Sequence, residues 1–168
     1  MAFAPASVGL LDGHADVGIT PKTGDAKFDS AKREYAVTGG GANIWGNADA
    51  FHFVHRQSDG RLHHYRRRAL HRKRCGGASE GRSDGVRLEA GSPYAGVAVH
   101  GDGVTSLQYR KEKDGITAEL KSAMKAPVRI RLQRRGDELI GPVYLGLAVC
   151  SHDANVLETA VFSNVIMK

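Results

Sequence analysis

The sequence predicts an all-β domain, an antiparallel sandwich of two sheets, from three observations. Short apolar runs recur between turn signals rich in glycine and aspartate, at intervals near the roughly 8 to 12 residues typical of sandwiches. The run at 128–133 alternates strictly between apolar and polar residues, as a strand with one buried face does. No window of a dozen residues shows a convincing helical period. A chain of 168 residues most simply forms one domain, so we expect residues 1–168 to share a single core.

The expected strands follow the turn signals along the chain. They are predicted at 35–37, 51–54, 94–100, 104–109, 116–120, 128–132, 143–149 and 159–166. The run at 143–149 is nearly all apolar and predicts a strand covered on both faces. The stretch 111–125 contains helix-forming residues, but Asp114-Gly115 interrupts it and Thr117 favours a strand.

The composition excludes several classes of protein. Hydrophobic residues make up 41% of the chain and charged residues 25%, which is ordinary for a globular domain and unlike collagen, coiled coil or disordered chains. No apolar run reaches the roughly 18 residues of a membrane span, and residues 1–11 lack the features of a secretory signal. Two cysteines, Cys75 and Cys150, do not make a disulfide framework. We therefore expect no membrane partner and, by default, a cytoplasmic protein.

The net charge of +6 is concentrated in residues 61–87, where nine basic residues meet only Glu80 and Asp84. This segment shows no helical or strand period, so we expect it to be irregular. Three interpretations stay open. The favoured one is a reading-frame artefact of a GC-rich gene, because codons can be chosen so that the adjacent frame encodes two alternating strands around a turn. The second is a solvated, disordered insertion. The third, least favoured, is a nucleic-acid patch formed by Arg66, Arg67, Arg68, Arg72, Lys73 and Arg74.

No pattern of catalytic residues stands out. The chain lacks a G-x-S-x-G nucleophile motif, and Cys150, which follows an apolar strand, is expected to be a buried structural residue. The carboxylates expected on or beside strands show none of the paired motifs of glycoside hydrolases; they are Glu34, Asp49, Glu119 and Glu158. The sequence therefore predicts no catalytic residues, although a hydrolase relic stays open.

Metal-ligand spacing is also missing. His14 and Asp16 lie two residues apart, as do His100 and Asp102, but both pairs flank turns where polar residues are common. We therefore expect no cofactor and no metal site. Calcium alone stays open, because hard oxygen ligands occur at Asp12, Asp16, Asp49 and Asp102.

Trp45 differs from the other aromatic residues, most of which occupy predicted strands. It lies between Asn43 and Asp49 in a glycine-rich stretch, and an aromatic ring beside polar side chains is typical of a sugar-stacking site. The alternative is that Trp45 plugs one end of the sandwich.

Six stretches carry a resemblance to a known family. They are GHADVG (13–18), GANIW (41–45), DAFHF (49–53), SPYA (92–95), HGDGVTSLQYR (100–110) and residues 141–165. Together they resemble the concanavalin A-like lectin/glucanase superfamily, and more closely the small bacterial domain found after Tol-type β-propellers. The resemblance implies a jelly roll that serves as an accessory domain, with carbohydrate as the ligand class.

Two departures from that family predict an incomplete jelly roll. Relatives have alternating strands in place of residues 61–85. They also carry a further strand pair between Ile140 and Gly141, which are adjacent in this chain.

These observations predict a non-catalytic accessory domain that binds an oligo- or polysaccharide. Trp45 and Tyr109 would stack on sugar rings, Asn43, Asp49 and Asp102 would accept sugar hydroxyls, and His100 would orient them. The main alternative is a scaffold domain without a small-molecule site, which docks on a neighbouring β-propeller or another protein. Lesser alternatives are the hydrolase relic and nucleic-acid binding through the basic segment.

Overall fold

The computed structural model describes residues 7–58, 89–125, 129–132 and 143–167, together with the backbone of 66–70 and 76–82. The described residues contain strands and no helix. All the paired strands run antiparallel, so the predicted all-β class is confirmed. No helix in this part of the chain is long and apolar enough to cross a membrane.

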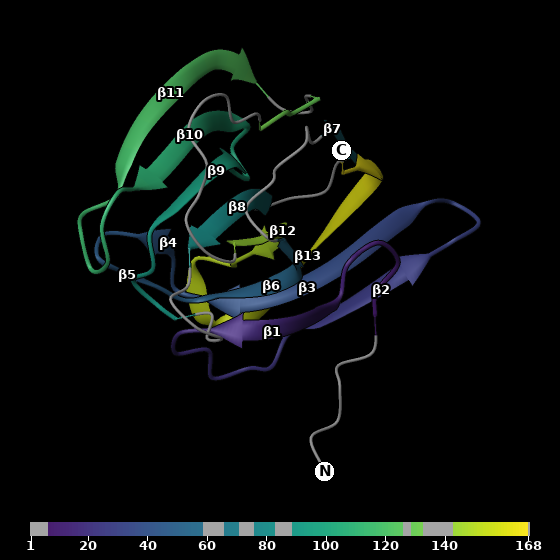
Figure 1. Cartoon of the computed structure of the whole chain (residues 1–168), viewed down its shortest axis with the longest axis horizontal. Helices are drawn as coiled ribbons and strands as arrows, with labels where there is room; N and C mark the ends of the chain where they lie inside the picture. The colour runs from purple at the N-terminus through teal and green to yellow at the C-terminus, as the bar shows by residue number, and fades with distance from the viewer. Residues whose placement is uncertain are drawn as a thin grey trace.

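The strands form two larger sheets and a short hairpin (Figure 1). The seven-stranded sheet consists, in spatial order, of β1 (Gly13–Val17), β6 (Phe51–Ser58), β12 (Val143–Val149), β8 (Gly76–Arg82), β9 (Tyr94–Val99), β10 (Val104–Arg110) and β11 (Ala118–Lys125). The four-stranded sheet consists of β2 (Asp25–Asp29), β3 (Glu34–Gly41), β13 (Asp153–Ile166) and β7 (Arg66–Leu70). The hairpin joins β4 (Ile44–Trp45) to β5 (Ala48–Asp49).

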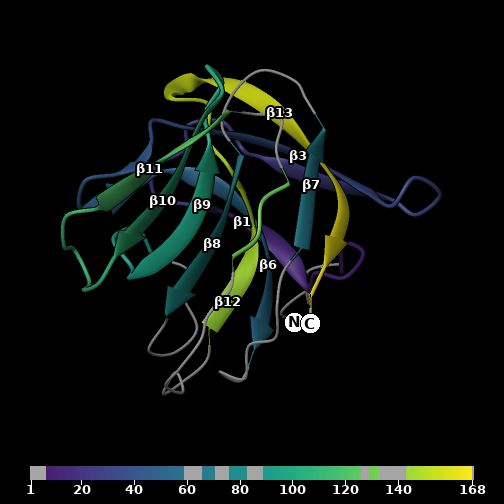
Figure 2. The ribbon, with the colours of Figure 1, turned by 90° about the horizontal axis from the view of Figure 1, so that it is seen from above.

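The main core lies between the two larger sheets, which form two layers in Figure 2. The seven-stranded sheet contributes Val54, Leu147 and Val149, and the four-stranded sheet contributes Val37 and Phe162 among others. Because successive side chains of a strand point to opposite faces, these residues mark the inward face of each sheet.

A second apolar cluster covers the other face of the seven-stranded sheet, which we call the outer face. It contains Val17, Phe51, Phe53, Tyr144, Ala148 and Cys150, with Ile44 of the hairpin packed against it. β12 therefore has apolar neighbours on both sides and every one of its residues is buried, as the run at 143–149 predicted. Cys150 is 3% exposed, which confirms the buried position expected for it.

Two of the predicted strands need correction. Residues 129–132 belong to no strand, although Ile130 is buried between the exposed Arg129 and Arg131 as the alternation predicted. Alternation reports which side chains are buried, whereas a strand also needs a neighbouring backbone to pair with. Residue 128 lies outside the described residues. The strand expected at 116–120 begins at Ala118 and continues to Lys125.

The prediction that residues 61–87 are irregular is wrong for two stretches. β7 pairs with β13, and β8 pairs with β12 on one side and β9 on the other. Strand pairing uses backbone groups, so two flanking strands can hold a third one whose side chains show no strand period. The rest of the segment, with Arg72, Lys73, Arg74 and Cys75, lies outside the described residues, so the three interpretations of its charge stay open.

Candidate functional site

The hairpin β4–β5 folds over the outer face and presents Trp45 to solvent. The Ala50 N–H donates a hydrogen bond to the Asn43 carbonyl at 2.7 Å, which closes the base of the hairpin. Ile44 packs against the apolar cluster, whereas Trp45 is 41% exposed. Gly46 turns the chain with a φ of 66°, a conformation that favours glycine. One side of the hairpin is thus buried while its only aromatic ring is accessible.

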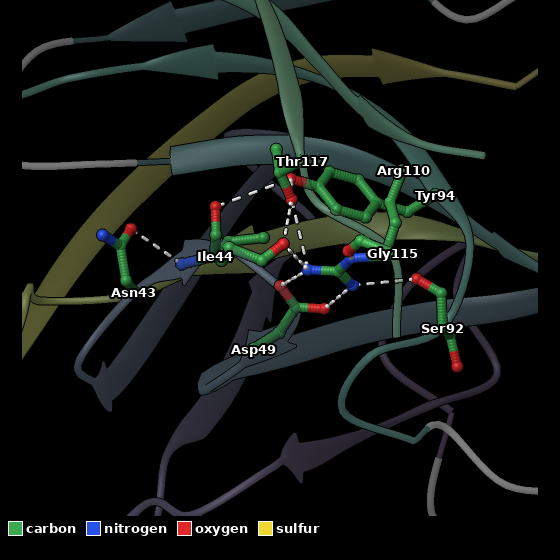
Figure 3. Close-up of polar contacts among 9 residues, drawn as sticks. Asn43, Ile44, Asp49, Ser92, Tyr94, Arg110, Gly115 and Thr117 are labelled. Atoms are coloured by element: carbon green, nitrogen blue, oxygen red, sulfur yellow. Dashed lines mark hydrogen bonds and ion pairs between the residues drawn. The ribbon is translucent and has the colours of Figure 1, made fainter. Parts of the chain in front are cut away.

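A buried ion pair fixes the base of this hairpin to β10 (Figure 3). Arg110 Nη1 donates to Asp49 Oδ2 at 2.6 Å, and Nη2 donates to Oδ1 at 2.9 Å. The two residues are 2% and 6% exposed. This two-point pairing of guanidinium and carboxylate fixes both distance and orientation.

The remaining donors of Arg110 hold the backbone around the ion pair. Nε donates to the Gly115 carbonyl at 2.8 Å, Nη1 to the Ser92 carbonyl at 3.0 Å, and Nη2 to the Gly46 carbonyl at 3.1 Å. Burial acts to lower the pKa of Arg110, but the hydrogen bonds and charge of Asp49 outweigh it, so the pKa is raised. The guanidinium therefore stays charged and joins the loops at Ser92 and Gly115 to the hairpin.

Thr117 and Tyr94 complete the network. The Thr117 N–H and its hydroxyl both donate to the Gly46 carbonyl, at 2.8 and 3.0 Å. The Tyr94 ring lies 5.1 Å from the Arg110 guanidinium, and its hydroxyl donates to Thr117 Oγ1 at 3.3 Å. The tip and the base of the hairpin are therefore both held against β9, β10 and the loop before β11.

A polar row continues along β10 on the outer face. Gln108 lies two residues from Arg110, so both point to the same side, and its Nε2 donates to Glu119 Oε1 at 3.3 Å. Burial acts to raise the pKa of Glu119, but the hydrogen bond from Gln108 and the nearby Ser106, Lys121 and His100 lower it. Glu119 is therefore an ionised acceptor at neutral pH.

The six predicted ligand residues do not form one cluster. Asn43, Trp45 and Asp49 share the hairpin. His100 and Asp102 lie in the turn between β9 and β10, at the other end of these strands from Arg110.

Two of the six predicted ligand residues, Tyr109 and Asp49, are not available on the outer face. Tyr109 is next to Gln108 in β10 and so points to the opposite face of the sheet. Asp49 is buried against Arg110, so its carboxylate orients the hairpin and is not free to accept a sugar hydroxyl.

Two histidines meet at the turn end of the polar row. The rings of His100 and His152 stack with centroids 6.0 Å apart and an angle of 15° between their planes. Gln108 Nε2 lies 3.4 Å from His100 Nε2. His100 thus belongs to a polar group with Gln108, whereas Asp102 Oδ1 accepts the Val104 N–H at 2.9 Å and caps the turn.

A second polar cluster lies on the inward face at the β1 edge of the sheet. His52 Nδ1 lies 2.6 Å from Asp16 Oδ1, and His52 Nε2 lies 2.9 Å from His14 Nδ1. The Gly24 N–H donates to both Asp16 oxygens, at 3.1 and 3.2 Å. We call His14, His52 and Asp16 the clasp. The sequence showed the two-residue spacing of His14 and Asp16 but not their neighbour His52, which strand pairing brings opposite Asp16.

The four aspartates that the sequence offered as possible calcium ligands do not come together in the structure. Asp16 and Asp49 are engaged as described, Asp102 caps its turn, and Asp12 Oδ2 accepts the Gln57 N–H at 3.0 Å. Among the described residues, no group of three or more His, Cys, Asp or Glu side chains is placed to hold a metal ion.

The buried His52 and the half-buried His55 predict a loss of stability in mild acid. Burial lowers the pKa of His52 and of His55 below the usual 6.5; for His52 it outweighs the opposing effect of Asp16. The unfolded chain then binds protons that the folded chain does not. This stabilisation is complete above about pH 6.5 and is lost as the pH falls through the folded-state values.

We therefore expect the melting temperature to fall as the pH is lowered from 7.5 to 5. The free energy of unfolding should fall by up to about 1.4 kcal/mol per pH unit for each histidine. Calorimetry across this range would test it. The carboxylates with lowered pKa values, such as Glu119, change the stability only near and below pH 4.5, so they do not contribute in this range. A constant melting temperature from pH 7.5 to 5 would contradict the prediction.

Comparison of the chain with protein-family models, with curated proteins and with solved structures gave no match in any of the three. The function is therefore argued from the hairpin, the polar row and the chemistry that they offer.

Proposed function

We propose that the chain is a non-catalytic binding domain for an oligo- or polysaccharide, with the Trp45 hairpin as the centre of its site. The observation that carries the proposal is an accessible aromatic ring on a hairpin whose base is fixed by a buried ion pair. A ring that is already held in place loses little conformational entropy when a ligand stacks on it. The resemblance to lectin/glucanase jelly rolls points to the same ligand class.

The surroundings of Trp45 suit the mixed surface of a sugar. Asn43 and Asn47 flank it on the hairpin and offer amide groups, of which Asn47 is exposed. Ile116 is 76% exposed. It lies beside the hairpin tip, because the next residue, Thr117, is hydrogen-bonded to Gly46. A sugar has apolar C–H faces and polar edges, and such a surface can contact both.

The positions of the carboxylates favour binding over hydrolysis. Glu34 and Glu158 belong to the four-stranded sheet, and Asp49 is paired with Arg110. Of the four candidate carboxylates, this leaves Glu119 on the outer face. Cleavage by the usual mechanism needs two carboxyl groups facing one bond.

Replacing Trp45 with alanine is expected to weaken glycan binding about fivefold or more, because stacking on an aromatic ring contributes on the order of 1 kcal/mol or more. Isothermal titration calorimetry with a panel of neutral, acidic and amino oligosaccharides would identify a ligand and then measure the loss.

Leu157→Ala is the matched control, since Leu157 is 38% exposed and lies on β13 of the other sheet. The proposal fails if the folded protein binds no member of the panel, or if both variants bind as the wild type does.

A second candidate function, docking on a partner protein, is favoured by the exposed apolar residues of β11. Leu120 and Met124 are 61% and 62% exposed in a strand at the edge of the sheet. Leu120→Asp would then abolish binding to a β-propeller partner in a pull-down with purified proteins, while Trp45→Ala would leave it unchanged. The opposite pattern would reject this candidate.

A further inference from the structure

The clasp joins the two larger sheets at one edge of the sandwich. Asp16 lies in β1 of the seven-stranded sheet, and Gly24, whose N–H it accepts, directly precedes β2 of the four-stranded sheet. His52 fills the space between them, because a Cβ added to Gly24 would lie 2.2 Å from His52 Nδ1, and one added to Gly39 would lie 2.8 Å from its Cβ. His52 is accordingly only 1% exposed.

The hydrogen bonds of the clasp fix where its protons are. A carboxylate only accepts hydrogen bonds, so His52 Nδ1 carries the hydrogen that points to Asp16. Neutral His52 then accepts at Nε2, and His14 Nδ1 must donate to it. His14 Nε2 makes no hydrogen bond within the described residues, so a proton added there breaks none of these contacts. Two N–H groups face each other at 2.9 Å once His14 and His52 are both protonated, because neither ring then has a lone pair left to accept at this contact.

The titratable groups that interact with His52 in the described part of the chain come from three elements. β1 contributes Asp16 and His14, the start of β2 contributes Asp25, and β6 contributes His55. Asp12, which lies 4.0 Å from Arg56, acts on His55. Asp16 and Asp25 favour the charged form of His52, while burial and His14 oppose it. The neutral form is therefore the one that fits this site.

We propose that the clasp is an acid-sensitive lock on this edge of the sandwich, which opens when His14 and His52 are both protonated. The His14–His52 contact is then lost and the positive charge must reach water, which separates β1 from the segment that leads into β2. This inference does not depend on the proposed carbohydrate ligand.

Amide hydrogen exchange on the whole chain at pH 7.5, 6 and 5 tests the lock, with rates corrected for the intrinsic effect of pH. Protection of the Gly24 amide and of the β1 amides is expected to fall by about tenfold per pH unit for each proton that opening takes up. The β9–β10 amides should change much less. Equal protection of Gly24 at all three pH values would overturn the proposal.

His14→Gln separates this lock from a general weakening in acid. The glutamine carbonyl can accept a hydrogen bond from the protonated His52 Nε2, so protection of Gly24 should no longer depend on pH. His152→Gln, which changes an exposed histidine outside the clasp, should keep the wild-type dependence. Because each variant is compared with itself at different pH values, an overall change in stability does not alter the test. A His14→Gln variant that loses protection as steeply as the wild type would overturn the lock.

Discussion

Replacing Arg110 with methionine is expected to lower the free energy of unfolding by about 3 to 5 kcal/mol. The substitution leaves the Asp49 carboxylate, 6% exposed, without its cation, and it removes the Arg110 donors from the carbonyls of Gly115 and Ser92. An unpaired buried charge costs far more than the loss of an exposed ion pair. Urea denaturation of the wild type and the variant measures the difference.

The chain offers a matched control in an exposed ion pair. Lys113 Nζ lies 2.9 Å from Glu89 Oε2 with both side chains largely in water, so Lys113→Ala should change stability by no more than about 1 kcal/mol. The double variant Arg110→Met/Asp49→Leu should be more stable than Arg110→Met alone, because it removes the unpaired carboxylate. If Arg110→Met behaves like Lys113→Ala, the ion pair does not hold the hairpin as described.

Leu147→Ala is expected to cost about 2 to 5 kcal/mol, since it leaves a cavity in the core between the two sheets. Leu147 is 1% exposed and belongs to the same apolar cluster as Val37 and Phe162 of the opposite sheet. The same substitution at Leu120, which is 61% exposed, should change stability by less than about 0.5 kcal/mol.

Thermal unfolding followed by circular dichroism would separate the two leucine variants. Each kcal/mol corresponds to roughly 2 to 4 °C in melting temperature for a domain of this size. Similar melting temperatures for the two variants would mean that the two sheets do not share the described core.

Much of the sandwich could be predicted because its central strands carry their own signal. The run at 143–149 is apolar throughout and coincides with β12, which has apolar clusters on both faces. β2 was not predicted because only one of its faces packs on the core, so its short sequence is mostly polar. Ala26 and Phe28 pack on the core, while Asp25, Lys27 and Asp29 point to water. β8 was missed because its neighbours, and not its side chains, complete its hydrogen bonds.

The candidate site was harder to predict because it depends on partners far apart in the sequence. The glycine-rich surroundings of Trp45 predicted that it lies in or beside a loop, but left open whether its ring is exposed or plugs the sandwich. The role of Asp49 did not, because Arg110 lies 61 residues away and reaches it only after the sheet has formed. The clasp has the same character, since 36 residues separate Asp16 from His52. Spacing along the chain predicts which side chains share a strand face, but not which strands become neighbours.

The hairpin also gives the molecule a built-in optical reporter. Trp45 is the only tryptophan in the chain, so the indole fluorescence of the whole protein comes from this one half-exposed ring. Its emission and its quenching by iodide should therefore follow the hairpin alone. When the Arg110–Asp49 ion pair is lost, the ring should become more mobile and more easily quenched, even before the sheets separate. Ligand contact and local loosening of the hairpin can thus be followed without attaching a dye.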